Sequence, residues 1–413
     1  ADQAREYAGG TGYDFLPMLG PTEPWISEAD LAICHLEGTL SATNSGMSGY
    51  PFFVGPREVA DAIAAVGYDA CSTSSNHAVD GGADGLAQTL ELLDERGIAH
   101  AGTARSEEER LPTLYNVNGV TVAHMDYTYS TNGVPQPYWY SVNRIDQGLI
   151  LDDARWAREH GAEFVIVSLH WGRENEHPPT AEQEQLAEAL LSSPDVDLIL
   201  GSHAHVVQPI DWINGKLVVY GMGNHLSNQN QIWGPGYWST EDGLMVYLTV
   251  TEQADGTFAT TGVQYIPTWV EFRSYRVLPI AWALAAGRPP GKAAGDRLPF
   301  VLLEKRPQVD GDQIVGPGID RVGEPRPALQ TALEERFVVA GEEHLALCVP
   351  PDGLVDSEIA SDELLQGADW RLGPDERQEV LKRFQDMRGV VWVRAEAKHA
   401  FRRCRLEIGD AMG

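Results

Sequence analysis

The segment that most constrains the fold is an apolar stretch, residues 196–200, followed directly by Gly-Ser-His-Ala-His. An apolar stretch of this length with polar flanks is typical of a buried strand. His203 and His205 stand two residues apart just beyond it, so their imidazoles leave the same strand end. Neutral imidazole is the commonest protein ligand for ions such as Zn, Mn and Fe. The pair therefore predicts a sheet with a metal site at its strand ends.

Three further apolar segments end in the same way, and candidate ligands follow each of them. Loops just beyond the carboxyl ends of strands are where open α/β sheets place their sites. A mixture of carboxylate, amide and imidazole ligands suits Zn, Mn or Fe(II) better than Ca or Mg. Six candidate ligands are more than one ion of this kind needs, so two divalent transition metals are predicted rather than one. The candidate ligands are Glu37, Asn76, His77, His170, His203 and His205.

Strand and helix patterns alternate between residues 28 and 225. Helices are predicted over residues 56–66, 82–96, 146–160 and 180–192. Strands are predicted over residues 31–36, 68–73, 113–116, 119–125, 163–169, 196–200, 206–212 and 216–220. From residue 243 the pattern changes to two long alternating strands, 243–251 and 258–267, joined at Asp255-Gly256. Such an order indicates a mixed α/β fold built as a layered sandwich.

Composition divides the 413-residue chain into three parts, which agrees with the limited size of single hydrophobic cores. Residues 1–284 are expected to form the main domain. Residues 285–330, rich in Pro, Gly, Lys and Arg, are expected to form an irregular linker or wrapping arm. Residues 331–413 predict a small α/β extension, with strands over 343–349 and 390–395 and a helix over 374–387.

Charge and the apolar pattern narrow the possible partners. The net charge of −30, from 30 basic and 60 acidic residues, argues against DNA, RNA or an anionic membrane as a partner. No apolar run approaches the roughly 20 residues that a membrane span requires. The chain as given has no signal peptide, so we expect a soluble protein with the cytoplasm as the default compartment. Export remains the alternative if the N-terminus is truncated, and the oligomeric state stays open.

The cysteines show no metal-binding spacing. Cys34 and Cys71 lie inside two of the predicted strands. We expect both to pack as small hydrophobic side chains.

Five short motifs follow one another along the first two thirds of the chain. They are His35-Leu36-Glu37, Ser75-Asn76-His77 with Asp80 and Gly82, His170-Trp171-Gly172 with Glu174, Gly201-Ser202-His203-Ala204-His205 with Gln208, and Tyr220-Gly221-Met222-Gly223-Asn224. In this order they resemble the CapA family, the poly-γ-glutamate capsule-synthesis proteins with a metallophosphoesterase-like fold. The resemblance implies an αββα sandwich of mixed sheets with a dinuclear metal centre at the strand ends.

The individual motifs also resemble elements of metallophosphoesterases. Asn76 and His77 resemble their Gly-Asn-His element, His170 their single intervening histidine, and His203 and His205 their closing histidine pair. Members of the family begin with a strand that ends in Gly-Asp and supplies one more carboxylate. Asp2 does not follow an apolar strand and is not a candidate ligand. Either the site lacks this carboxylate or the chain lacks its first strand, and we favour the second.

Three side chains near the ligands have two interpretations each. Asp80 either accepts a hydrogen bond from a metal-bound histidine or caps the helix that follows it. His35 either supports the site from the second shell of contacts or is buried for structural reasons. Glu174 is a candidate general acid or base, together with His203 and His170, and the alternative is a solvated loop carboxylate.

Substrate contacts are expected from Trp171, Arg173, Asn224 and His225. Trp171 is interpreted as a pocket wall, and a core position is the alternative. Arg173 either meets a substrate carboxylate or phosphate or neutralises the neighbouring acidic residues. His225 is expected to reach the pocket, although the family usually has an aromatic residue there.

A metal centre of this kind does not determine the reaction. The resemblance favours an enzyme that processes a γ-linked glutamate polymer or a related peptide through amide chemistry. A second hypothesis is epimerisation at a Cα atom of a ribosomal peptide precursor of the lasso type, by acid/base proton transfer. Phosphoester hydrolysis and a non-catalytic binding module are the further alternatives. A peptide or glutamate polymer is therefore the expected partner, and the strong negative charge favours a neutral or basic peptide.

Overall fold

The computed structural model describes residues 1–230, 239–285, 396–397 and 400–401. The chain forms two compact units, and the described residues up to 283 belong to the first. The predictions for residues 286–330 and for most of 331–413 lie outside the described residues. There the structure describes only β15 (Glu396–Ala397) paired with β16 (Ala400–Phe401).

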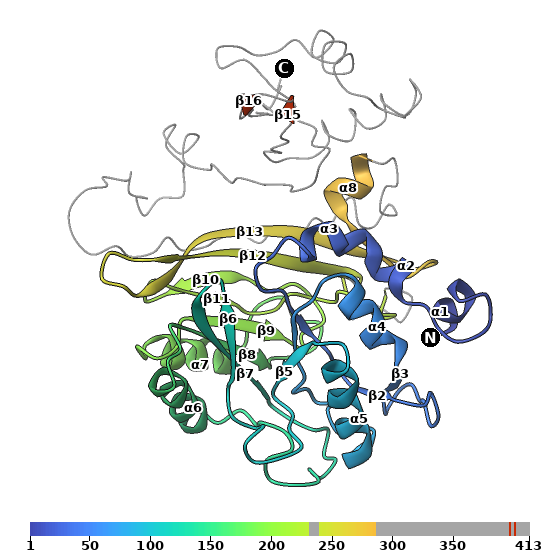
Figure 1. Ribbon diagram of the computed structural model, residues 1–413, viewed down its shortest axis with the longest axis horizontal. Helices are drawn as coiled ribbons and strands as arrows, with labels where there is room; N and C mark the ends of the chain where they lie inside the picture. The colour runs from blue at the N-terminus through green and yellow to red at the C-terminus, as the bar shows by residue number, and fades with distance from the viewer. Residues whose placement is uncertain (231–238, 286–395, 398–399, 402–413) are drawn as a thin grey trace, which may run out of the picture. The chain divides into compact units, whose positions relative to one another are not determined.

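A six-stranded mixed sheet lies at the centre of the first unit (Figure 1). Its strand order is β10-β11-β9-β8-β7-β6, and β11, β9, β8 and β7 are parallel. The edge strands β6 and β10 pair antiparallel with their neighbours across the two Asn-Gly turns. The strands are β6 (Thr113–Val117), β7 (Val120–Thr128), β8 (Phe164–His170), β9 (Leu198–Ser202), β10 (Ile210–Ile213) and β11 (Lys216–Val219).

Two helices cover one face of this sheet, α6 (Gln147–Glu159) and α7 (Ala181–Leu191). Their apolar stripes pack on the sheet in one core cluster, which includes Ile150 and Leu190 of the helices and Val167 of β8. Each helix begins at a side-chain cap, because Asp146 accepts from Leu149 N and Thr180 accepts from Gln183 N. The caps agree with the helix starts predicted from the sequence.

The opposite face packs on two three-stranded sheets. One is antiparallel, with β12 (Asp242–Glu252), β13 (Phe258–Glu271) and β14 (Arg276–Pro279). The other is parallel, with β1 (Ile33–His35), β4 (Ala70–Ser72) and β5 (Ala99–Ala101). Side chains of β1 and β12 share a core cluster with the inner face of the central sheet, as Ile33, Leu244 and Phe164 show.

Helices close this second side of the sandwich. α4 (Glu58–Ala65) and α5 (Gly82–Asp94) pack on β4 through Ile63 and Leu93. The order of layers is therefore helix, sheet, sheet, helix (Figure 1), and the predicted αββα sandwich is confirmed. The remaining elements are α1 (Asp2–Tyr7), α2 (Leu16–Leu19), η1 (Gly20–Thr22), α3 (Glu23–Ile26), β2 (Thr39–Ser41), β3 (Val54–Pro56) and α8 (Ile280–Ala285). Among the described helices, none combines the length and apolarity needed to cross a bilayer.

The prediction for two of the cysteines is wrong. Cys34 and Cys71 are register partners on the parallel strands β1 and β4, and they form a disulfide. The sequence did not indicate this bond, because strand register brings together two residues that stand 37 positions apart. The disulfide ties together the two strands that lead to His35 and Asn76.

Removal of this disulfide is expected to destabilise the protein. The bond closes a loop with a sequence separation of 37 residues, so the Cys34→Ala, Cys71→Ala double variant should lose about 4 kcal/mol of unfolding free energy. Urea denaturation with and without a reductant measures this loss. The reductant should destabilise the wild type and leave the double variant unchanged. Equal midpoints for the oxidised wild type and the double variant would contradict the prediction.

Candidate metal centre

Strand register places the candidate ligands at one end of the sandwich. Thr128, His170 and Ser202 are register neighbours at the ends of β7, β8 and β9, and His203 follows directly. In the other layer His35 ends β1 opposite Ser72 of β4. The rings of His35 and His170 stack with centroids 4.9 Å apart, so the strand ends of both layers meet.

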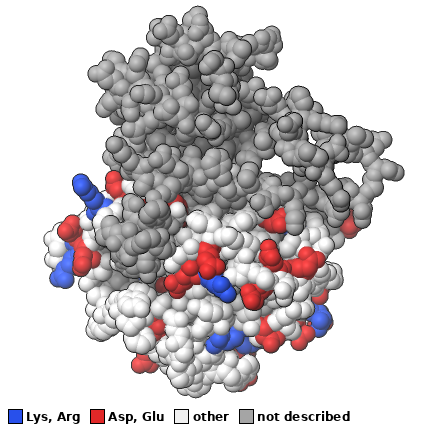
Figure 2. Space-filling view, turned by 180° about the vertical axis from the view of Figure 1, so that it is seen from behind, with Lys and Arg blue, Asp and Glu red and all other residues white. Residues whose placement is uncertain are grey.

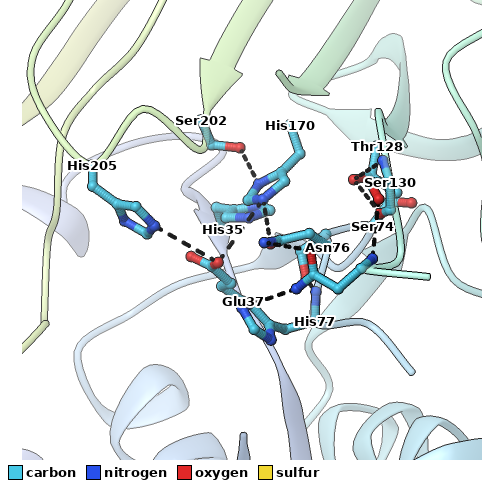
Figure 3. A network of polar contacts seen from close by, with 12 residues as sticks. His35, Glu37, Ser74, Asn76, His77, Thr128, Ser130, His170, Ser202 and His205 are labelled. Atoms are coloured by element: carbon cyan, nitrogen blue, oxygen red, sulfur yellow. Dashed lines mark hydrogen bonds and ion pairs between the residues drawn. The ribbon is translucent and has the colours of Figure 1, made fainter. Parts of the chain in front are cut away.

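Two groups of three side chains can each hold a metal ion. The first is His35, Glu37 and His170, and the second is Glu174, His203 and His205. Within each group one ligand atom per residue lies within 4.8 Å of the others. Glu37 links the two groups, because its Oε1 lies 3.9 Å from His170 Nε2 and 4.0 Å from His205 Nε2 (Figure 3).

The nitrogen atoms of these groups are suited to metal binding. His35 Nε2 and His203 Nδ1 are buried and have no hydrogen-bond partner among the described residues. Burial, with a further effect of the neighbouring histidines, lowers the pKa of His35 to about 4 and that of His203 to about 3. The same causes hold the pKa of the fully buried His170 well below its ordinary value. These imidazoles are therefore neutral near pH 7, which is the form that binds metal, and the donor set fits a divalent transition ion.

Side chains of neighbouring strands orient the histidines. His170 Nδ1 lies 3.0 Å from Ser202 Oγ, and His35 Nδ1 lies 2.8 Å from Ser72 Oγ. The contact with Ser72 leaves His35 Nε2 without a partner among the described residues, and the contact with Ser202 directs His170 Nε2 toward the first group. His35 thus belongs to the first group itself, and the expectation that it only supports the site is corrected.

Two asparagines contact the ligand histidines. Asn76 Oδ1 lies 2.9 Å from His170 Nε2, so its amide oxygen is directed at the same place as the first group (Figure 3). Asn224 Oδ1 lies 2.9 Å from His205 Nδ1. The structure therefore places Asn224 as the residue that orients His205, although we expected a substrate contact from the sequence.

His77 lies beside the two groups and not within either of them. Its Nδ1 lies 2.6 Å from Asp80 Oδ2, and its ring contacts Phe53 at a centroid distance of 4.6 Å. Burial alone would lower the pKa of His77, but the hydrogen bond to Asp80 and the carboxylates of Asp80, Glu37 and Glu174 together raise it. The N-cap residue of α5 is Gly81, and no side chain caps this helix, so Asp80 does not cap it and contacts His77 instead.

Each of the other three residues expected to contact the substrate contacts another residue of the chain. Trp171 is only 3% exposed, belongs to the core under α6 and α7, and donates to the carbonyl of Tyr220 at 2.9 Å. It is a core residue and not a pocket wall, because its side chain points back into the central sheet cluster. His225 contacts Tyr68, with no described contact to the histidine groups. The exposed Arg173 pairs with Glu176 at 3.8 Å.

Tyr129 is a residue of the site that we did not identify from the sequence. It follows β7 directly, and its ring centroid lies 4.5 Å from that of His203 and 6.3 Å from that of His170. Its position just beyond a strand end was the available signal, but a tyrosine is a common core or surface residue and carries no ligand signature.

The sequence model for the bacterial capsule synthesis protein family PGA_cap matches residues 1–229 of the chain, which include every ligand of both groups. The chain belongs to this family. The family assignment confirms the resemblance inferred from the ordered motifs.

Known relatives support the same assignment. The PGA biosynthesis protein CapA of Bacillus subtilis (strain 168) is 31% identical over 196 residues, which are 46% of this chain and 50% of that protein. The capsule biosynthesis protein CapA of Bacillus anthracis is 28% identical over 195 residues, 46% of each chain. A probable polyglutamine synthesis accessory protein of Mycobacterium tuberculosis is 26% identical over 255 residues, 58% of this chain and 65% of that protein. The chain thus spans about half the length of the two capsule relatives.

Two solved structures show some likeness to the chain. NAD nucleotidase of Haemophilus influenzae has a TM-score of 0.35 and 15% identity over 53% of this chain and 45% of that one. A calcineurin-like phosphoesterase of Bacillus subtilis has a TM-score of 0.34 and 17% identity over 51% of this chain and 66% of that one. These scores are low, and the fold assignment rests on the observed layers and on the family match.

Proposed function

We propose that this capsule-synthesis family member is a dinuclear metal-dependent enzyme that acts on amide bonds of a γ-linked glutamate polymer or a related peptide. One observation carries the proposal: two three-residue metal-binding groups, joined by Glu37, lie at the strand ends of both sheets. The names of the relatives, which refer to PGA biosynthesis and polyglutamine synthesis, support a glutamate-polymer substrate.

The proposal assigns a separate role to each group of residues in the site. His35, Glu37, His170 and Asn76 would hold one ion, and Glu174, His203 and His205 the other. When bound, a pair of divalent ions supplies Lewis acidity and a water molecule of lowered pKa. His77 is outside both groups and its Nδ1 contacts Asp80, so His77 is the candidate donor of a proton to the leaving group. Asp80, at 2.6 Å, holds the ring of His77 in position.

Metal content and a product assay test the proposal together. Protein purified without chelator should contain close to two equivalents of Zn, Mn or Fe by elemental analysis, and chelation should abolish turnover. Poly-γ-glutamate should become shorter in size-exclusion profiles, with new amino termini appearing. The proposal is wrong if the purified protein contains no bound transition metal. It is also wrong if protein that contains the metal leaves the polymer and related peptides intact.

The same samples distinguish the alternative reactions. Turnover of an aryl phosphate in place of the polymer would select phosphoester hydrolysis. Uptake of deuterium from heavy water into an uncleaved peptide would select epimerisation. Binding of the polymer without any chemical change would select a non-catalytic module.

The disulfide between Cys34 and Cys71 is informative about the cellular compartment of the protein. Disulfides persist in oxidising surroundings and are rare in the cytosol. The Cys34–Cys71 bond therefore supports an exported location for this protein. Labelling of free thiols in protein taken from the native host, before and after reduction, tests this location.

A further inference from the structure

Positive charge is scarce on this protein. The chain has 30 basic and 60 acidic residues, and Figure 2 shows carboxylates spread over one face with basic side chains at few places. Many described arginines are already paired with carboxylates, namely Arg96, Arg105, Arg110, Arg155, Arg158 and Arg173. An exposed arginine near the site with no described carboxylate partner is therefore the candidate to bind a substrate carboxylate.

Arg144 lies in the row of strand ends that forms the metal centre. Its backbone makes a parallel bridge with Thr128, and Thr128 is the register partner of His170. Adjacent strands are about 4.8 Å apart, so Arg144 stands two strand spacings from a metal-binding histidine. The side chain of Arg144 is exposed, and no ion pair among the described residues includes it.

Tyr129 connects Arg144 to the histidines. Arg144 Nη2 donates to the carbonyl oxygen of Tyr129 at 2.6 Å, which holds the guanidinium near the residue whose ring packs on His203. The side chain of Tyr129 is 41% exposed, and its ring centroid lies 6.3 Å from that of His170. Tyr129 thus contacts the arginine through its backbone and a histidine of each group through its ring, which is partly open to solvent.

We propose that Arg144 binds a carboxylate of the substrate beside the metal centre, with the ring of Tyr129 as the adjoining wall. A guanidinium presents a planar set of N–H donors that matches a carboxylate, and one of them is used by the Tyr129 carbonyl. Each residue of a γ-linked glutamate chain carries a free α-carboxylate, so the ligand class is an α-carboxylate next to the reacting amide. This inference rests on the proposed function and names the residue that recognises its substrate.

Calorimetric binding to the full chain, loaded with metal, tests the inference without requiring turnover. The two probes are γ-linked triglutamate and its analogue with every α-carboxylate amidated. Wild-type protein should bind the carboxylate probe at least about tenfold more tightly. Arg144→Gln should lose this preference and bind the amidated probe as the wild type does, and Arg144→Lys should recover part of it.

Arg155→Gln is the matched control, since Arg155 is an exposed arginine that pairs with Asp152 on α6. It should keep the wild-type preference, and all variants should unfold at the wild-type midpoint. The inference is overturned if the wild type binds both probes with the same affinity. It is also overturned if Arg144→Gln lowers the affinity for both probes equally or for neither. Failure of the proposed function gives a different result from failure of this inference. In that case the protein would leave the polymer uncleaved but would still bind the carboxylate probe more tightly than the amidated probe.

Discussion

Replacement of Glu37 by Gln should remove bound metal and nearly all activity. Glu37 Oε1 lies within 4.0 Å of a histidine in each metal-binding group, so its carboxylate is placed to serve both ions. Glutamine keeps the size of the side chain but removes the negative charge that balances two divalent ions. We expect the metal content to fall from about two equivalents to one or fewer. Turnover should fall at least about a hundredfold, because even residues that only orient metal ligands contribute tenfold to a hundredfold.

The matched control for Glu37 is Glu176→Gln. Glu176 is an exposed carboxylate a few residues beyond β8, and its described ion pair is with Arg173. This variant should retain both metal equivalents and wild-type turnover. Elemental analysis of both proteins, purified side by side, decides the comparison. A Glu37→Gln protein that keeps two tightly bound ions would show that this carboxylate is not a shared ligand.

Replacement of Gly201 by Ala should destabilise the whole protein. A Cβ atom at this position would lie 1.9 Å from the carbonyl oxygen of Tyr220 and 2.7 Å from Nε1 of Trp171. The first contact is with backbone, so no side-chain rotation relieves it, and β9 must separate from its neighbours. We expect a loss of about 4 kcal/mol or more of unfolding free energy. Because His203 follows two residues later, metal affinity should fall as well.

Gly49→Ala is the control for this substitution. Gly49 is exposed and outside the left-handed region, and an added Cβ would meet nothing within 4 Å. Alanine there should leave stability unchanged or raise it by about 0.4–1 kcal/mol, because it restricts the unfolded chain. Urea denaturation curves of the two variants measure both effects. A Gly201→Ala protein as stable as the wild type would mean that the strand ends are packed more loosely than the structure shows.

Local pattern was sufficient to predict the main elements. The apolar run at residues 163–169 predicted a strand, and β8 occupies Phe164–His170. The amphipathic stretch at 82–96 predicted a helix, and α5 occupies Gly82–Asp94. The short helices α2 and α3 were not predicted, because four residues with proline at the start show no helical periodicity.

Contacts between segments that are distant in the sequence could not be predicted from local sequence patterns. Trp171 directly follows a strand, as the pocket-wall interpretation required, yet its ring lies in the core against Tyr220. His35 and His170 stack although 135 positions separate them in the sequence. Tyr129 and Arg144 lie at the site only because their loop returns to pair with the end of β7.

The sequence by itself therefore determined that a set of candidate metal ligands stands at strand ends, because hydrophobic periodicity and ligand chemistry are local properties, but it did not include His35 and Glu174 in that set. The tertiary structure decided how these side chains are divided. It grouped His35 with Glu37 and His170, left His77 with Asp80, and paired Cys34 with Cys71. Such pairings depend on strand register and on how two sheets stack, and these arise from the packing of the whole core.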